Sequence, residues 1–206
     1  MNYLFKLLTL LFCKKAGIAF KLSIVFLLST IISIAQTNEM FGTTALIGNT
    51  GTYNAAGGFK ALSNNGNGFF NSVIGAHALL NNTTGFSNAA LGFQSLYINT
   101  EGYCNVACGQ QALYWNDKGK CNTALGKDAG WSNIGDSNVF LGHQAGFYEA
   151  GNNKLYIANG KNATLIYGDF ISGNIGIGTT TPLSTLSIAS NKIGPKITLW
   201  DNANAA

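Results

Sequence analysis

The sequence has no arginine, and only 10% of its 206 residues are charged. Globular domains usually carry about a quarter charged residues, so this composition is unusual for a compact domain. Four of the twelve lysines, Lys6, Lys14, Lys15 and Lys21, lie near the N-terminus, which leaves eight lysines and eight acidic residues in the rest of the chain. Phosphate contacts need clustered cations, and we therefore expect no nucleic-acid partner.

Residue patterns typical of catalysis are also missing. His77 and His143 fall at different positions of a repeated unit, and neither has an acidic partner at a recurring spacing. The carboxylates are scattered, and Gly173, Gly176 and Gly178 do not follow a nucleotide-binding pattern. We therefore expect no enzyme activity, no cofactor and no metal ion.

Long apolar runs occur only in the first 35 residues. Basic residues precede the run from Leu22 to Ala35, which closes on Ser33-Ile34-Ala35. This order predicts a signal peptide over residues 1–35, with Gln36 as the new N-terminus. Because the run reaches twenty residues when counted from Ala16, with one lysine inside it, an uncleaved anchor is the alternative. We expect a secreted chain, extracellular or on the outer cell surface, with no membrane span after cleavage.

An asparagine recurs about every 17 residues and opens a repeated unit. The six are Asn54, Asn71, Asn88, Asn105, Asn122 and Asn138. So short a period predicts a solenoid, in which each coil is stable only when stacked on the next. At the strand spacing of about 4.8 Å, the stacked asparagines can form a ladder of amide hydrogen bonds. The expected fold is an all-β parallel β-roll or β-solenoid of about six coils.

Within each unit a short strand follows the asparagine, and a glycine follows the strand. These corner glycines are Gly58, Gly75, Gly92, Gly109, Gly126 and Gly142. The alternation favours the first and third strand residues, such as Ala89 and Leu91, as the inward-facing ones. An Ala-Leu pair, such as Ala112-Leu113, forms a second strand or a single turn, and Asn64, Asn81, Asn99 and Asn116 mark the turn after it.

The repeats divide the chain. Residues 36–53 are expected to form an N-terminal cap, 54–152 the repeat array, and 153–189 a short β-rich neck or shaft. Residues 190–206 are interpreted as the start of an incomplete C-terminal segment. Terminal repeats of a solenoid are commonly atypical, as they are here.

The tandem Asn-x-Ala-Leu-Gly units, as in residues 88–92 and 122–126, resemble the head repeats of YadA-like trimeric autotransporter adhesins. The segments 153–158, 165–170 and 175–182 are similar to shaft modules of secreted bacterial fibres and phage tail fibres. The resemblance covers about Gly42 to Ile188 and implies a left-handed parallel β-roll and a homotrimer. The unit is longer than the adhesin-head coil, and neither an anchor barrel nor coiled-coil heptads are seen, so autotransport has no support.

The repeat gives a second reason to expect a homotrimer. A coil of 17 residues is too thin to bury both apolar columns, so one of them, the Ala-Leu column, should face other subunits. A monomer with both columns folded inward is the alternative.

Two sets of side chains are candidates for sites. Tyr97, Tyr114 and Trp115 could form an aromatic ladder for sugar rings, or could pack at a subunit seam instead. Cys104 and Cys121 hold the same place in successive units, within disulfide reach, although stacked side chains often point alike. Cys108 takes the place of an inward Leu and is expected to be a buried free thiol.

The function most consistent with these features is a secreted or surface-displayed fibrous adhesin that attaches to glycans or host surfaces through repeated shallow contacts. A phage-type tail-fibre module for receptor binding is the first alternative. A polysaccharide-acting or ice-binding β-solenoid is the second. The lyase type would need a groove of acids and basic residues, and an ice binder would need a flat threonine column.

Overall fold

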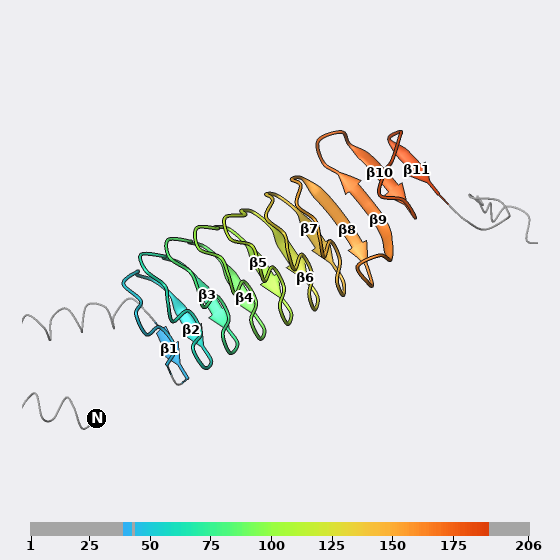
Figure 1. The fold of residues 1–206 in the computed structure, drawn as a ribbon. Helices are drawn as coiled ribbons and strands as arrows, with labels where there is room; N and C mark the ends of the chain where they lie inside the picture. The colour runs from blue at the N-terminus through green and yellow to red at the C-terminus, as the bar shows by residue number, and fades with distance from the viewer. Residues whose placement is uncertain (1–38, 43, 190–206) are drawn as a thin grey trace, which may run out of the picture.

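The computed structural model describes residues 39–42 and 44–189 (Figure 1). The expected signal peptide and the segment 190–206 lie outside the described residues. No helix occurs in the described part, and the eleven strands form one sheet in sequence order. They are β1 (Glu39–Phe41), β2 (Ala55–Gly57), β3 (Ser72–Ile74), β4 (Ala89–Leu91), β5 (Val106–Cys108), β6 (Thr123–Leu125), β7 (Val139–Leu141), β8 (Lys154–Ala158), β9 (Thr164–Asp169), β10 (Asn174–Ile177) and β11 (Leu186–Ile188).

Strands β1 to β8 pair in parallel, each with the next, and the loops return on the other side of the array (Figure 1). The predicted all-β parallel β-solenoid with a coil of about 17 residues is therefore confirmed. About seven coils are present, because β1 adds one within the segment expected to be a cap. Beyond β8 the chain changes direction: β8, β9 and β10 pair antiparallel, and β11 then adds in parallel to β10.

Each strand is only three residues long in the array because a glycine turns the chain immediately after it. At Gly109 φ is +140°, a conformation that L side chains rarely adopt. A Cβ there would lie 2.4 Å from the carbonyl oxygen of Gly126, the corner glycine of the next coil. The glycines thus allow the coils to approach closely at one corner.

Buried asparagines form two parallel ladders inside the solenoid. The first contains the six asparagines that open the units, all at most 1% exposed. The second contains Asn65, Asn82, Asn99, Asn116 and Asn133, which are fully buried and linked amide to amide along the axis. Of the asparagines that mark this turn in the sequence, Asn99 and Asn116 belong to the second ladder, whereas Asn64 and Asn81 lie one residue before its members Asn65 and Asn82. Asn64 is exposed, and its amide donates to Oδ1 of Asn81 at 3.1 Å outside the core.

The core is built from the middle residue of each strand and from the Ala-Leu turns. The middle residues are Ala56, Val73, Ala90, Ala107, Ala124 and Phe140, all at most 3% exposed. Leu62, Leu79, Leu96 and Leu113 are fully buried. Two predictions were therefore wrong: the first and third strand residues face outward, and the Ala-Leu column lies inside the coil. The strands are apolar on both faces, so alternation alone cannot tell which face is inside, and the narrow corner accepts small residues.

Phe140 explains why the last two units lose their leucine. Gly130 and Gly146 take the leucine position, with φ of +58° at both. A Cβ at Gly130 would lie 2.6 Å from the Phe140 ring, and one at Gly146 would lie 2.2 Å from it. One phenyl ring therefore fills the space of two leucine side chains, which keeps the core packed where the sequence repeat weakens.

Candidate functional site

One column of apolar side chains runs along the outer face of the whole sheet. Strand pairing aligns the third residue of each array strand with its counterpart in the neck. This outer column contains Phe41, Gly57, Ile74, Leu91, Cys108, Leu125, Leu141, Ile157, Ile166, Ile177 and Ile188. The Phe41 ring covers the space left at Gly57, since a Cβ there would lie 2.1 Å from it.

The outer column is accessible to solvent in the single chain. Ile74 is 52% exposed, Leu91 50% and Leu125 43%. Cys108, which was expected to be buried, is a half-buried free thiol in this column because the strand faces the other way from the prediction. A contiguous exposed apolar strip of this length is typical of an interaction surface rather than of a solvated monomer.

Two of the three aromatic residues proposed as a ladder, Tyr97 and Tyr114, do stack, and the stack continues to residues that were not predicted, whereas Trp115 lies outside it. Tyr97, Tyr114, Trp131 and Phe147 form one stack, here named the Tyr97 column, with ring centroids 4.9, 5.6 and 5.1 Å apart and planes within 9°. Partial burial, and then the neighbouring Tyr97, raise the pKa of the Tyr114 hydroxyl. Both faces of Tyr114 are covered by its neighbours, so no face is free for a sugar ring. Trp115 stands beside the stack, edge-on to Tyr114 at 5.5 Å, and is 43% exposed.

A second aromatic stack was missed by the sequence analysis. Phe69, Phe86 and Tyr103 stack at 4.9 and 4.7 Å with planes within 6°. The ammonium of Lys120, in the same position of the next coil, lies 5.6 Å from the Tyr103 ring centroid. The sequence does contain a pattern that predicts this stack, because each of the three aromatic residues lies two positions before an opening asparagine. Both stacks pack ring on ring along the axis and stabilise the array.

Cys104 and Cys121 are neighbours on adjacent coils and are free thiols. Partial burial raises the pKa of the Cys121 thiol, and the adjacent Cys104 thiol raises it further. Both are exposed, and both have the left-handed backbone of their column, with φ of 55° and 56°. They occupy the same position in successive coils, two residues before β5 and β6.

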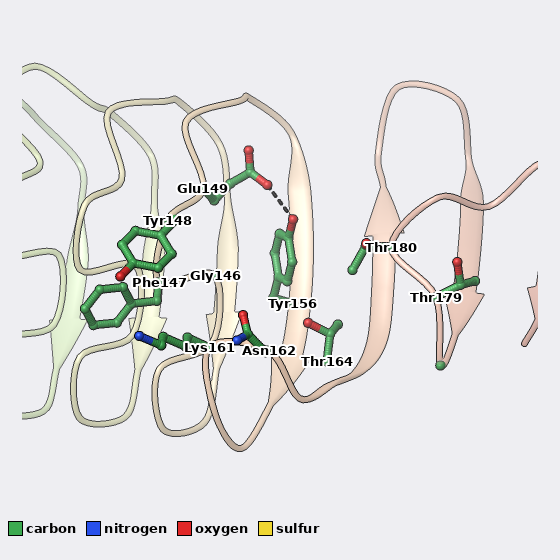
Figure 2. Close-up of a pocket in the computed structure, with 11 residues that line it drawn as sticks. Gly146, Phe147, Tyr148, Glu149, Tyr156, Lys161, Asn162, Thr164, Thr179 and Thr180 are labelled. Atoms are coloured by element: carbon green, nitrogen blue, oxygen red, sulfur yellow. Dashed lines mark hydrogen bonds between the residues drawn. The ribbon is translucent and has the colours of Figure 1, made fainter. Parts of the chain in front are cut away.

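The junction between the array and the neck contains a cavity of about 550 Å³. The wall on the array side comes from the loop after β7, with Phe147, Tyr148 and Glu149 (Figure 2). The rest of the lining comes from Tyr156 of β8, from Lys161 and Asn162 of the β8–β9 loop, from Thr164 of β9, and from Gly178 to Thr180 after β10. We name this the junction cavity. Its residues come from three separate loops and from two strands, β8 and β9, and no single repeat pattern relates them.

Glu149 and Tyr156 form a fixed pair in the junction cavity. The Tyr156 hydroxyl donates to Oε2 of Glu149 at 2.5 Å (Figure 2). The Gly151 amide donates to Oε1 of Glu149 at 2.6 Å. Burial, and then the bonded Glu149 carboxylate, raise the pKa of the Tyr156 hydroxyl far above its usual value. Each oxygen of the Glu149 carboxyl group thus accepts one hydrogen bond, and the two donors fix its orientation.

Lys161 has a different environment from Glu149. Its ammonium lies 5.6 Å from the Tyr148 ring centroid and 6.0 Å from that of Phe147. Within residues 39–42 and 44–189, the ion pairs join other lysines to acids, and none includes Lys161. The cavity therefore contains an exposed cation that lies beside two aromatic rings and forms no ion pair with an acid of the described residues.

The described residues contain no cluster of three or more His, Cys, Asp or Glu that could hold a metal ion. His77 follows β3 and His143 follows β7, so several coils separate them. No helix in the described part of the chain is long and apolar enough to cross a membrane.

Comparison with known proteins gives no match to any family model, any curated protein or any solved structure.

Proposed function

We propose that this chain is part of a secreted or surface-displayed fibre, an adhesin-like head that attaches to glycans or host surfaces and has no catalytic role. In this proposal three copies associate in parallel through their outer columns, as the resemblance of the repeats to YadA-like adhesin heads implies. The export signal expected over residues 1–35 favours this function over the tail-fibre alternative.

The observation that carries the proposal is the continuity of the outer column. It extends from Phe41 in β1 to Ile188 in β11 and crosses the junction where the solenoid ends. Closing the core requires apolar residues on the inner face of the neck only. Apolar residues repeated on its outer face therefore indicate a second role for the neck. Each fully buried Leu or Ile side chain contributes about 1.5–3 kcal/mol, so a column of this length can hold subunits together firmly.

Attachment follows from the geometry of such an assembly. A rigid rod has few deep cavities, and its repeated surfaces give several weak contacts per subunit. Three identical subunits multiply these contacts, so avidity compensates for weak individual sites. The two aromatic stacks would lie on the outside of the trimer, away from the sheet face.

The proposal can be tested by measuring how well beads coated with the chain attach to a surface of immobilised host glycoproteins. The test variant is Ile74→Lys, which places a charge in the outer column. The control is Ile134→Lys, which changes an isoleucine of similar exposure, 62%, on a turn outside the sheet. Ile74→Lys should abolish the trimer and reduce attachment strongly, and Ile134→Lys should leave both as in the unmodified chain.

Two results would count against the proposal. If the unmodified beads attach no better than uncoated beads, the chain is not an adhesin. If Ile74→Lys and Ile134→Lys behave alike, the outer column does not join subunits.

A further inference from the structure

We propose that the junction cavity binds an acidic saccharide, a sugar ring that carries a carboxylate. This inference deepens the proposed function, since it names a site and a ligand class for the attachment. It places recognition at the end of the array, and not on the Tyr97 column where the sequence suggested it.

The size and lining of the junction cavity fit a sugar. Its volume of about 550 Å³ falls within the range of roughly 300–1,000 Å³ that ligand sites occupy. Most lining residues carry a hydroxyl, amide or charged group. The side chains of Asn162, Thr164 and Thr180 make no hydrogen bond to the rest of the described chain, so their polar groups are available to a ligand. Tyr148, 65% exposed, gives an apolar wall for the C–H face of a pyranose.

The cavity has two ends of different character. Figure 2 shows the Glu149 carboxylate beside the Tyr156 hydroxyl, and the Lys161 ammonium away from them, beside Phe147. Glu149 retains lone pairs that can accept from sugar hydroxyls. Lys161 is a cation without an acidic partner, and a carboxylate on the ligand would supply that partner. The charge arrangement therefore favours a ring with hydroxyls at one end and a carboxylate at the other.

The cavity stays open when the outer column is covered. Tyr156 pairs with Phe140 in the strand register, so its side chain lies on the core side of the sheet. Its neighbours Leu155 and Ile157 pair with Val139 and Leu141 and lie on the outer face. Subunits that meet through the outer column therefore leave the junction cavity facing solvent, with one site per subunit.

Ligand-observed NMR titration of the purified chain with methyl glucuronide tests the inference, with the methyl glucoside of the same anomer as the uncharged probe. The variant is Lys161→Gln, and because Lys161 is exposed the substitution leaves the core intact. Lys60→Gln is the matched control, since the Lys60 ammonium lies 5.5 Å from the Phe59 ring at the other end of the array.

The glucuronide should bind better than the glucoside. Lys161→Gln should weaken glucuronide binding about tenfold or more, the loss expected for one charge-assisted hydrogen bond, and Lys60→Gln should have no effect.

Three results would overturn the inference: equal binding of both glycosides, no binding of either, or glucuronide binding that Lys161→Gln leaves unchanged. They are separable from failure of the proposed function. A trimeric chain that attaches to surfaces but binds neither glycoside overturns only the saccharide site. A monomeric chain that binds glucuronide through Lys161 overturns only the trimeric adhesin.

Discussion

Replacing Asn105 by alanine should destabilise the solenoid far more than replacing an exposed asparagine. Asn105 is fully buried, and its amide group bonds to both neighbouring coils. Its Oδ1 accepts from the backbone amide of Asn122 at 3.0 Å. Its Nδ2 donates to Oδ1 of Asn88 at 3.1 Å and to the carbonyl of Gly119 at 2.8 Å, and makes a longer contact of 3.4 Å with Oδ1 of Asn99.

The cost can be worked out bond by bond. Alanine leaves the buried Asn122 N–H without this acceptor, and an orphaned buried group costs about 1–3 kcal/mol. The Gly119 carbonyl keeps a second donor, Nδ2 of Asn116 at 2.7 Å, and Oδ1 of Asn88 keeps the backbone amide of residue 105 at 3.0 Å. These two lost bonds therefore cost only their net contribution of about 1 kcal/mol each. The longer bond to Asn99 adds little, because Oδ1 of Asn99 keeps Nδ2 of Asn116 at 3.0 Å. We expect a loss of about 3–5 kcal/mol in the free energy of unfolding.

Urea unfolding followed by circular dichroism measures this loss, with all proteins at one concentration because association contributes to stability. Asn64→Ala is the control, since Asn64 is exposed and makes one bond to Asn81 on the surface. A surface substitution of that kind should cost less than about 0.5 kcal/mol. Equal losses for Asn105→Ala and Asn64→Ala would refute the argument that the buried amide ladder holds the coils together.

Further substitutions test the corner, the core and the thiol pair. Gly109→Ala should cost more than about 3 kcal/mol in urea, because strain at φ +140° and a contact of 2.4 Å with the Gly126 carbonyl add together; a loss under 1 kcal/mol would contradict this. Leu96→Ala, at a fully buried position, should cost about 2–5 kcal/mol in a thermal melt, and unchanged melting would show that the turn is not part of the core. The pKa of the Cys121 thiol is raised, so its reactive thiolate forms only at a higher pH than that of an unburied thiol. The rate at which Cys121 is alkylated should therefore increase at a higher pH than the rate for an unburied thiol. Cys104→Ser should move that rise toward lower pH, and a profile that does not move would show that Cys104 has no influence.

The parts of this fold that repeat could be predicted, and the parts that do not repeat could not. Period and residue type placed the opening asparagines and the corner glycines, because both must recur in every coil for the backbone to stack. Which strand face is inside was not predictable from alternation, since Ala90 inside and Leu91 outside are both apolar. The larger residue faces outward here because the leucines of the turns already fill the interior.

The junction cavity shows a second limit of prediction from the sequence. Glu149 lies in the β7–β8 loop, Tyr156 on β8 and Lys161 in the β8–β9 loop, and the reversal of direction after β8 brings Lys161 into the cavity formed with the other two. No spacing in the sequence marks such a meeting of loops. The Tyr97 column, by contrast, could have been extended to Trp131 and Phe147, since these residues continue the same position when the shorter last units are aligned.

The mass of the purified chain in solution, measured by light scattering at several concentrations, tests the central claim that the outer column is a subunit interface. The account predicts a particle of three chains that persists on dilution to micromolar concentration. A particle with the mass of one chain at all concentrations would contradict it, because the exposed apolar strip would then be stable in water without a partner.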